Sequence, residues 1–369
     1  MNLPAVLRSL LLRLAQPRVD VPLLVALLLL MGVGLVTLSS AAGESPRTVM
    51  AQALRLGAGL AALWLLSRVP PAQLRLWTPW VFVGSLLLLL LVPLLGSGRS
   101  ARSWIDLGFF YLQPAELLKL SVPMMVAWYL QREPLPPRWR ALAVAAVVIG
   151  VPAGLIAIQP DLGTAVVVGA SGAFVVFMAG IHWWRIGALV GVAAMVAPLG
   201  WGFLREYQRD RLRTFLTPEA DPLGAGWNII QSKIAVGSGG LFGKGWGMST
   251  QSRLEFLPEH TTDFIFAVLA EEFGLIGVLG VLALYLFIVG RSLWIAAMAR
   301  DTYARLLGGA LALTFLVYVV VNGGMVSGLL PVVGVPMPLM SYGGTSAVSL
   351  LAGFGILMSV HAHRKLMGP

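Results

Sequence analysis

One acidic side chain lies where a long polar run meets an apolar segment of this chain. The polar and charged run extends from Arg205 to Gly274, and within it Asp263 directly precedes the apolar sequence that starts at Phe264. Desolvating a carboxylate costs several kcal/mol, so an ionisable group at a membrane border is a candidate functional group. The chemistry open to it is proton transfer.

Three roles are open for Asp263. As an N-cap of the next helix, its carboxylate would accept hydrogen bonds from backbone amides. As a proton relay, it would act with Glu271 or Glu272, and Glu271 falls on roughly the same helix face. As a general base, it would remove a proton from a substrate at the membrane surface. A cap lowers the pKa of the carboxylate and weakens the base, so these two roles compete.

A second acid and base, Glu116 and Lys119, lie three residues apart in an apolar segment that begins at Pro114. This spacing places both side chains on one helix face, where they can form an ion pair. Such a pair is costly inside a membrane unless it faces a cavity or the protein interior. We therefore expect either a contribution to a substrate cavity or a structural bridge between helices.

The polar run also carries cations. Arg209 and Arg211 lie near its start, and Lys244 lies within a glycine-rich stretch, residues 237–247. Glycines allow close backbone approach, and backbone amides with a lysine can surround an anion. The spacing is not that of a P-loop. We expect these cations either to bind a lipid-linked phosphate or pyrophosphate, or to attract anionic headgroups without specificity.

The composition predicts an all-α, polytopic membrane protein. Of its 369 residues, 58% are hydrophobic and 11% are charged, and the mean hydropathy is +0.84. The apolar runs are continuous and about 20 residues long, the length of a helical span rather than of a barrel strand. Ten spans are predicted, at residues 21–39, 50–67, 78–95, 114–130, 141–158, 163–180, 187–203, 264–290, 305–322 and 345–361.

The arginines predict the orientation of the spans. Most of them fall in connections on one side, whereas the short loops of the other side hold only Arg47, Arg99 and Arg102. The positive-inside rule then places both termini in the cytoplasm and the long loop 204–262, between the seventh and eighth spans, outside. The whole chain, residues 1–369, is interpreted as one transmembrane domain without a cleavable signal.

Several kinds of site are excluded or disfavoured. The chain has no cysteine, which excludes disulfides and thiolate chemistry, and its four histidines lack metal-ligand spacing. No metal site is therefore predicted. The net charge of +10 is typical of cytoplasmic loops near anionic lipid, and no basic run is interleaved with aromatic residues, so we expect no nucleic-acid partner.

The remaining outside loops hold further candidates. Residues 96–113 include Trp104, and Asp161 is interpreted as an N-cap of the sixth span. The last outside loop, residues 322–346, is uncharged and rich in glycine and proline, so we expect it to dip into the membrane against other spans. Its Ser341 and Tyr342 either contact an anion or sugar or only begin the tenth span.

Four motifs resemble those of the SEDS family, the shape, elongation, division and sporulation proteins. The longest runs from Asn322 to Ser346 and includes Gly328-Leu329-x-Pro331 and Ser341-Tyr342-Gly343-Gly344. The others are Leu257-Pro258-Glu259-x3-Asp263-Phe264-Ile265-Phe266-Ala267, Gln113-Pro114-Ala115-Glu116, and Asp221-Pro222-x-Gly224-x-Gly226. The stretches 243–246 and 250–258 are more similar to the family's elongation members than to its division members.

The chain departs from the family pattern at two positions. Thr261 stands where the family commonly has a histidine, and His260 is one residue earlier. A histidine at that site therefore cannot be indispensable, which places the weight on the carboxylate of Asp263. Ser103 stands where a basic residue commonly precedes the tryptophan of the second outside loop, which leaves the role of Arg102 open.

The resemblance implies a peptidoglycan glycosyltransferase of cell elongation and shape maintenance. It would lie in the bacterial inner membrane, with its active site on the extracytoplasmic face. The acceptor would be lipid II and the donor a lipid-linked glycan strand. Asp263 would be the general base on the acceptor 4-hydroxyl, and the lipid pyrophosphate would leave in one inverting displacement that forms a β-1,4 linkage.

The resemblance also implies a substrate site and a partner. The side chains expected to contact substrate are Glu116, Lys119, Trp104, Arg209, Arg211, Lys244, Ser341 and Tyr342. A class B penicillin-binding protein, a transpeptidase, would dock on the outside loops. A divalent cation is a candidate cofactor, although the sequence shows no closed ligand set. Two alternatives are a lipid II flippase that uses Glu116, Lys119, Glu271 and Glu272, and a non-catalytic scaffold for the penicillin-binding protein.

Overall fold

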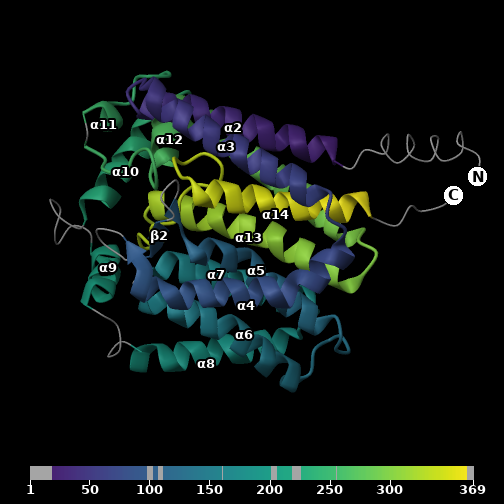
Figure 1. The fold of residues 1–369 in the computed structure, drawn as a ribbon. Helices are drawn as coiled ribbons and strands as arrows, with labels where there is room; N and C mark the ends of the chain where they lie inside the picture. Colours follow the sequence, from purple (N-terminus) through teal and green to yellow (C-terminus); the bar gives the residue numbers. More distant parts are fainter. Residues whose placement is uncertain are drawn as a thin grey trace, which may run out of the picture.

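The computed structural model describes residues 19–97, 103–106, 111–159, 161–200, 206–217, 226–254 and 256–363. Long helices lie side by side, and a group of shorter helices, α9 to α11, covers one end of the bundle (Figure 1). The helix α2 begins, and α14 ends, at the opposite end (Figure 1). The helices are α2 (Val21–Ala41), α3 (Pro46–Ser67), α4 (Pro71–Leu95), α5 (Pro114–Leu130), α6 (Trp139–Ile158), α7 (Leu162–Met178), α8 (Trp183–Gly200), α9 (Glu206–Leu216), α10 (Trp227–Ser238), α11 (Thr250–Arg253), α12 (Ile265–Ala297), α13 (Thr302–Val326) and α14 (Thr345–Ala362).

Each of the ten predicted spans coincides with a helix, although the last residues of 187–203 lie outside the described residues. In the described part of the chain, seven helices are long and apolar enough to cross a membrane: α2, α3, α4, α6, α12, α13 and α14. The chain is therefore a multi-pass membrane protein. That α5, the shorter apolar helix α7 and α8 also cross remains a prediction.

The predicted outside loops are more structured than expected. Residues 204–262 contain α9, α10 and α11. In the second outside loop, β1 (Gly96–Ser97), β2 (Trp104–Asp106) and β3 (Tyr111–Leu112) form a small antiparallel sheet in the order β1-β2-β3. Trp104 pairs with Ser97 in this sheet.

Aspartates begin several helices, as their short acceptor side chains favour. The carboxylate of Asp161 accepts a hydrogen bond from the Thr164 amide at 3.0 Å, so the predicted cap of α7 is confirmed. Asp20 caps α2 in the same way, and its buried carboxylate also binds Arg291 of α12 at 2.7 Å. This ion pair joins the first and eighth predicted spans at the end of the bundle away from α9.

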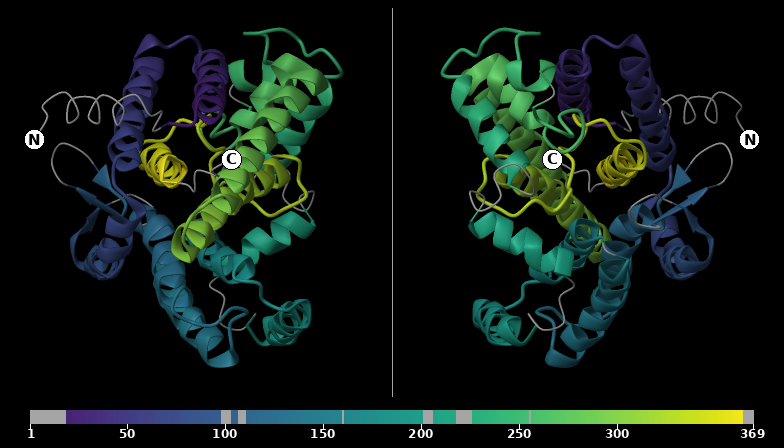
Figure 2. Two further views of the ribbon diagram at one scale, coloured as in Figure 1. Left: turned by 90° about the vertical axis from the view of Figure 1, so that its right-hand side faces the viewer. Right: turned by 90° about the vertical axis from the view of Figure 1, so that its left-hand side faces the viewer.

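The helices α13 and α14 form the centre of the bundle. About two thirds of the apolar window of α13 and 72% of that of α14 are buried, against 22% for α3. Figure 2 shows α14 (yellow) between α3 and α13 when the bundle is viewed from either end. The C-terminal part of the chain therefore supplies the surface on which the other helices pack.

The helix α12 is broken at Gly274, which has φ 64° and ψ −164°, a conformation essentially confined to glycine. The break leaves carbonyl groups without helical partners. The backbone amides of Lys244 and Gly245 donate to the carbonyls of Glu271 and Glu272, each at 3.0 Å. A stretch of the long outside loop thus completes the hydrogen bonding of the first half of the helix.

The same loop stretch serves the second half of α12. The carbonyls of Gly240 and Leu241 accept hydrogen bonds from the amides of Leu275 and Ile276, at 2.9 and 3.2 Å. The backbones approach so closely that a Cβ on Gly274 would lie 2.3 Å from the backbone nitrogen of Gly243. A Cβ on Gly239 or Gly243 would lie 2.0 or 2.1 Å from a carbonyl oxygen of α12, so these two glycines are required for the insertion.

The break predicts a sharp difference between two glycines of α12. Gly274→Ala should destabilise the protein by at least about 3 kcal/mol, because it combines a forbidden conformation with a backbone clash. Gly280→Ala, where an added Cβ meets nothing within 4 Å, should be neutral or slightly stabilising. Thermal unfolding of the two purified variants measures this. Equal melting temperatures would show that the break is not required.

Candidate active site

Asp263 lies in a tight turn immediately before α12. Glu259 adopts a left-handed conformation with φ 57°, and its carbonyl accepts hydrogen bonds from the amides of Thr262 and Phe264 at 3.1 and 3.2 Å. The N-cap position of α12 is Phe264, and no side chain caps the helix. The cap role considered for Asp263 is therefore wrong. Its carboxylate accepts no hydrogen bond from the first amides of α12.

The turn is held by Asn322 of α13, which is fully buried. Its side-chain amide donates to the backbone carbonyl of Asp263 at 2.7 Å and to that of Val335 at 2.8 Å. One amide thus joins the acid to the uncharged last loop. The carboxylate lies beside this loop, since a Cβ on Gly334 would be 3.6 Å from its Oδ2.

Ser341 makes a second connection between the turn and the last loop. Its hydroxyl donates to the carbonyl of Thr262 at 2.6 Å and accepts from the amide of Met337 at 2.8 Å. The amide of Tyr342 donates to the carbonyl of Thr261 at 2.9 Å. The last loop is buried from Met337 to Ser341, as expected of a segment that packs among spans. In the structure, Ser341 holds the backbone in place.

The environment of Asp263 favours its neutral form more than water does. Burial, together with the negative charge of Glu259, raises the pKa of Asp263 to about 6, and the positive charge of Arg211 on α9 opposes the rise. Among the described residues, none donates a hydrogen bond to the carboxylate. Asp263 is thus a half-buried acid with no partner to balance its charge fully, which suits a group that accepts and releases a proton near neutral pH.

Two residues of α3 that the sequence reasoning missed lie at the same loop. The Gln52 side chain donates to the carbonyl of Ser341 at 3.1 Å and accepts from the amide of Gly343 at 3.2 Å. The guanidinium of Arg55 lies 4.3 Å from the ring centre of Tyr342. A glutamine and an arginine inside a predicted span were the available signal, because polar groups there require protein partners.

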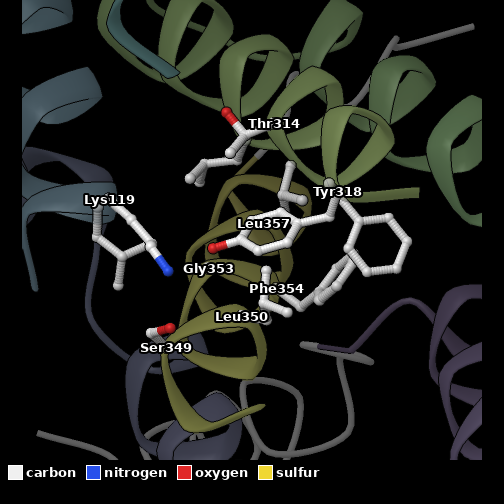
Figure 3. A pocket seen from close by; sticks show the side chains of 11 residues that line it. Lys119, Thr314, Tyr318, Ser349, Leu350, Gly353, Phe354 and Leu357 are labelled. Carbon is white, nitrogen blue, oxygen red and sulfur yellow. The ribbon is translucent and has the colours of Figure 1, made fainter. Parts of the chain in front are cut away.

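Glu116 and Lys119 form the predicted ion pair, at 2.6 Å, and both are buried. Ser349 of α14 donates to the other oxygen of Glu116 at 2.6 Å, and the ammonium lies 5.2 Å from the ring centre of Tyr318 on α13. Figure 3 shows the ammonium and the Tyr318 hydroxyl pointing toward one another. The pair therefore joins α5, α13 and α14.

The space beside this pair is small. The cavity lined by Lys119, Tyr318 and Ser349 has a volume of about 30 Å³, far below the roughly 300–1,000 Å³ of sites for small molecules. It has room for water but not for a sugar. The geometry favours the structural bridge over direct contact with substrate.

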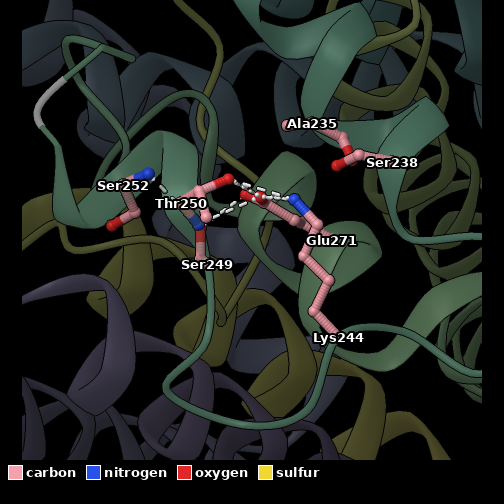
Figure 4. A network of polar contacts seen from close by, with 7 residues as sticks. All are labelled: Ala235, Ser238, Lys244, Ser249, Thr250, Ser252 and Glu271. Atoms are coloured by element: carbon pink, nitrogen blue, oxygen red, sulfur yellow. Dashed lines mark hydrogen bonds and ion pairs between the residues drawn. The ribbon is translucent and has the colours of Figure 1, made fainter.

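Lys244 is engaged by Glu271 on the first half of α12. Its ammonium lies 2.6 Å from Oε1 of Glu271, and the same carboxylate accepts hydrogen bonds from Ser249 and from the amide and hydroxyl of Thr250 (Figure 4). Glu272 accepts from Ser40 and from a loop amide. These acids anchor the inserted loop, and the structure does not bring Lys244 to Asp263.

The other predicted contacts lie apart or at the edge of the site. Arg211 is exposed on α9 and acts on Asp263 through its charge, and Arg209 lies on the same helix. Trp104 is in β2. His260 hydrogen-bonds through Nδ1 to the carbonyl of Leu257 at 2.8 Å. Arg102 and residues 221–225 lie outside the described residues, and the last residue of that motif, Gly226, is the N-cap of α10.

The buried pair yields a test by substitution. Lys119→Met should destabilise the protein by about 3 kcal/mol, because Glu116 would remain buried without a counter-charge. The double variant Glu116→Gln with Lys119→Met should recover most of that loss in thermal unfolding. If the double variant is stable but has lost the activity of the wild-type protein, the pair has a chemical role. If its stability is no better than that of Lys119→Met, the bridge account is contradicted.

Comparison with known sequences places the chain in a family. The profile of the family described as "Cell cycle protein", which comprises FtsW, RodA and SpoVE, matches residues 18–366. The chain belongs to this family, the SEDS proteins, and within it is most like RodA.

Named relatives agree with this placement. The chain is 48% identical over 350 residues to the peptidoglycan glycosyltransferase MrdB of Escherichia coli K12. The aligned residues cover 94% of this chain and 95% of the relative. It is 38% identical over 305 residues to the probable peptidoglycan glycosyltransferase FtsW of Trichlorobacter lovleyi, covering 79% of this chain and 78% of the relative.

Solved structures confirm the fold. The rod shape determining protein RodA of Thermus thermophilus matches with a TM-score of 0.72 and 32% identity, covering 94% of this chain and 97% of that one. A chain described under "Structural coordination of polymerization and crosslinking by a peptidoglycan synthase complex" matches with a TM-score of 0.84 and 33% identity, covering 94% and 99%.

Proposed function

We propose that this chain is a peptidoglycan glycosyltransferase that polymerises lipid II into β-1,4 glycan strands during cell elongation and shape maintenance. The family and the 48% identity to MrdB support the activity. One observation supports Asp263 as the catalytic residue. Its carboxylate is half-buried, caps no helix, and has a pKa raised to about 6. Glu271 and Glu116, by contrast, are already bound to lysines.

Asp263 acts as the general base. With a pKa of about 6, its carboxyl group is mostly ionised at neutral pH and is a stronger base than an ordinary aspartate. It takes the proton of the acceptor 4-hydroxyl as that oxygen attacks the anomeric carbon of the lipid-linked donor. The bond from this carbon to the pyrophosphate breaks, and the pyrophosphate leaves with the electron pair. One displacement turns an α-linked donor into a β-linked product.

The leaving pyrophosphate needs positive charge more than it needs a proton. Arg211 supports this role best, because its charge reaches Asp263 from α9, and Arg209 lies one half-turn away on the same helix. The other proposed substrate contacts are Ser341, Tyr342, Trp104 and Lys244, whereas Glu116 and Lys119 are proposed to bridge α5, α13 and α14 instead. For Lys244, such a contact requires exchange of its Glu271 partner.

A divalent cation has limited support as a cofactor. Within the described ranges, no three histidine, aspartate or glutamate side chains lie close enough to hold a metal ion. One or two carboxylates together with substrate phosphates can hold a divalent cation, so such a cation stays a candidate cofactor.

The distribution of arginines supports the proposed membrane orientation. Connections at the end of the bundle opposite α9 hold Arg132, Arg138, Arg140, Arg185 and Arg300, which favours the cytoplasm for that end and the extracytoplasmic face for Asp263. The site then opens toward the leaflet where a glycan strand is assembled. A class B penicillin-binding protein would dock on the outside loops.

The flippase alternative has less support. It requires exchangeable protons at Glu116, Lys119, Glu271 and Glu272, but the structure holds the first three of these in ion pairs. The scaffold alternative gives no reason for an unbalanced acid at the junction of α12 and the last loop.

Asp263→Asn should reduce glycan polymerisation by at least about 100-fold, because the amide cannot accept the proton. The assay uses the purified protein with its penicillin-binding partner and lipid II in detergent, and reads polymer length on a gel. The variant should unfold no more easily than wild type at pH 8, because an ionised carboxylate at this site is disfavoured by burial.

Asp161→Asn is the matched control, because asparagine also caps helices and Asp161 lies at the start of α7. It should polymerise at near the wild-type rate. Polymer from Asp263→Asn would remove Asp263 as the base. Transbilayer movement of lipid II in vesicles without polymer from wild type would favour the flippase.

Glu259→Gln tests the electrostatics of the site. Polymerisation needs the ionised carboxylate, so its rate should fall as pH drops below the pKa of Asp263, about 6. Removing the negative charge of Glu259 lowers this pKa and should shift the acidic limb of the pH–rate profile to lower pH. Glu44→Gln makes the same charge change on an exposed residue of the α2–α3 connection and should leave the limb in place. An upward shift in Glu259→Gln would contradict the assignment.

A further inference from the structure

An apolar cavity lies between α6, α7 and α8, at the end of the bundle away from Asp263. Its volume is about 470 Å³, and all of its lining residues are hydrophobic or aromatic, including Trp139, Ala146, Phe174, Phe177 and Ile186. Figures 1 and 2 show α8 at the margin of the bundle beside α6. The volume falls within the roughly 300–1,000 Å³ typical of small-molecule sites.

A cation lies beside the wall of this cavity. The guanidinium of Arg185 is 5.1 Å from the ring centre of Trp139, which lines the cavity, and 5.5 Å from that of Trp184. Its Nη1 donates to the carbonyl of Pro137. Its Nε is buried and has no hydrogen-bond acceptor among the described residues. The group therefore carries a full charge and an unused donor next to apolar space.

Arg185 differs from the other arginines that stack on tryptophans. Arg68, Arg132 and Arg291 each contact one tryptophan three or four residues away on the same helix or its end. Those pairs are local helix-surface contacts. Arg185 instead lies between tryptophans of two different helices, α6 and α8, at the place where these helices enclose the cavity.

The surrounding connections are strongly basic. Residues 131–140 and 179–186 contain four arginines and one acid, Glu133. Tryptophans and arginines together are typical of the level of lipid headgroups, and basic pockets between membrane helices bind acidic phospholipids. A ligand that fits must therefore combine an anionic head with an apolar chain.

We propose that the α6–α7–α8 cavity is a binding site for an acidic phospholipid of the cytoplasmic leaflet. One acyl chain fills the apolar cavity, and the phosphate accepts hydrogen bonds from the Arg185 guanidinium. The lipid fastens α8 to α6 and α7. The proposal does not rest on the glycosyltransferase activity, because the site lies at the opposite end of the bundle from Asp263.

Native mass spectrometry of the purified full-length chain tests this site. The probes are dioleoylphosphatidylglycerol and dioleoylphosphatidylcholine, which share acyl chains, and glycerol phosphate, which has no chain. Wild type should retain one molecule of dioleoylphosphatidylglycerol and should release dioleoylphosphatidylcholine and glycerol phosphate. Arg185→Gln should weaken retention by about fivefold, the effect of one arginine at an anionic lipid surface.

Two further variants separate the charge from the cavity. Ala146→Trp fills the cavity without changing charge and should abolish retention. Arg68→Gln, the matched control, removes an arginine that stacks on a tryptophan away from the cavity and should retain the lipid. Near-ultraviolet circular dichroism checks that each variant is folded. Equal retention of both lipids by wild type, or unchanged retention in folded Ala146→Trp, would overturn the proposal, whatever the polymerisation assay shows.

Discussion

The side-chain amide of Asn322 is the interaction on which the site depends. It spans two backbone carbonyls, those of Asp263 and Val335, from segments that are remote in sequence. The bond to the Asp263 carbonyl is partly buried and the bond to the Val335 carbonyl is buried, and an unpaired buried carbonyl costs about 1–3 kcal/mol. A buried asparagine with both bonds formed therefore fixes the turn before α12 against the last loop. The acid takes its position from this junction rather than from the helix it precedes.

The break in α12 complements that junction. The first half of the helix, Ile265 to Gly274, has Asp263 at one end and Glu271 near the other. The inserted loop closes its free carbonyls, and Lys244 balances the charge of Glu271. The short half-helix is thus held at both ends, while Asp263 has neither a counter-charge in contact nor, among the described residues, a hydrogen bond to its carboxylate. A buried, unbalanced acid destabilises a fold, and such groups are typical of sites where function requires them.

Part of this arrangement follows from the sequence. The lengths of the apolar runs predict the membrane class and the helices, and the spacing of Glu116 and Lys119 predicts their pair. The Asp161 cap could also be predicted, because it joins residues only three apart, Asp161 and Thr164. The sequence could not decide among the cap, relay and base roles of Asp263. The position of this residue depends on Asn322, which is 59 residues away, and on the left-handed conformation of Glu259. Lys244 looked like an anion ligand because its partner, Glu271, is 27 residues away. Long-range pairing decides both cases.

The proposed base function requires that the fold raise the pKa of Asp263. Isotope-edited infrared difference spectroscopy of labelled aspartates, with Asp263→Asn subtracted, titrates this carboxyl group directly in the folded protein. The account predicts a midpoint at about pH 6. A midpoint at or below about 4, the value of an ordinary aspartate, would contradict it.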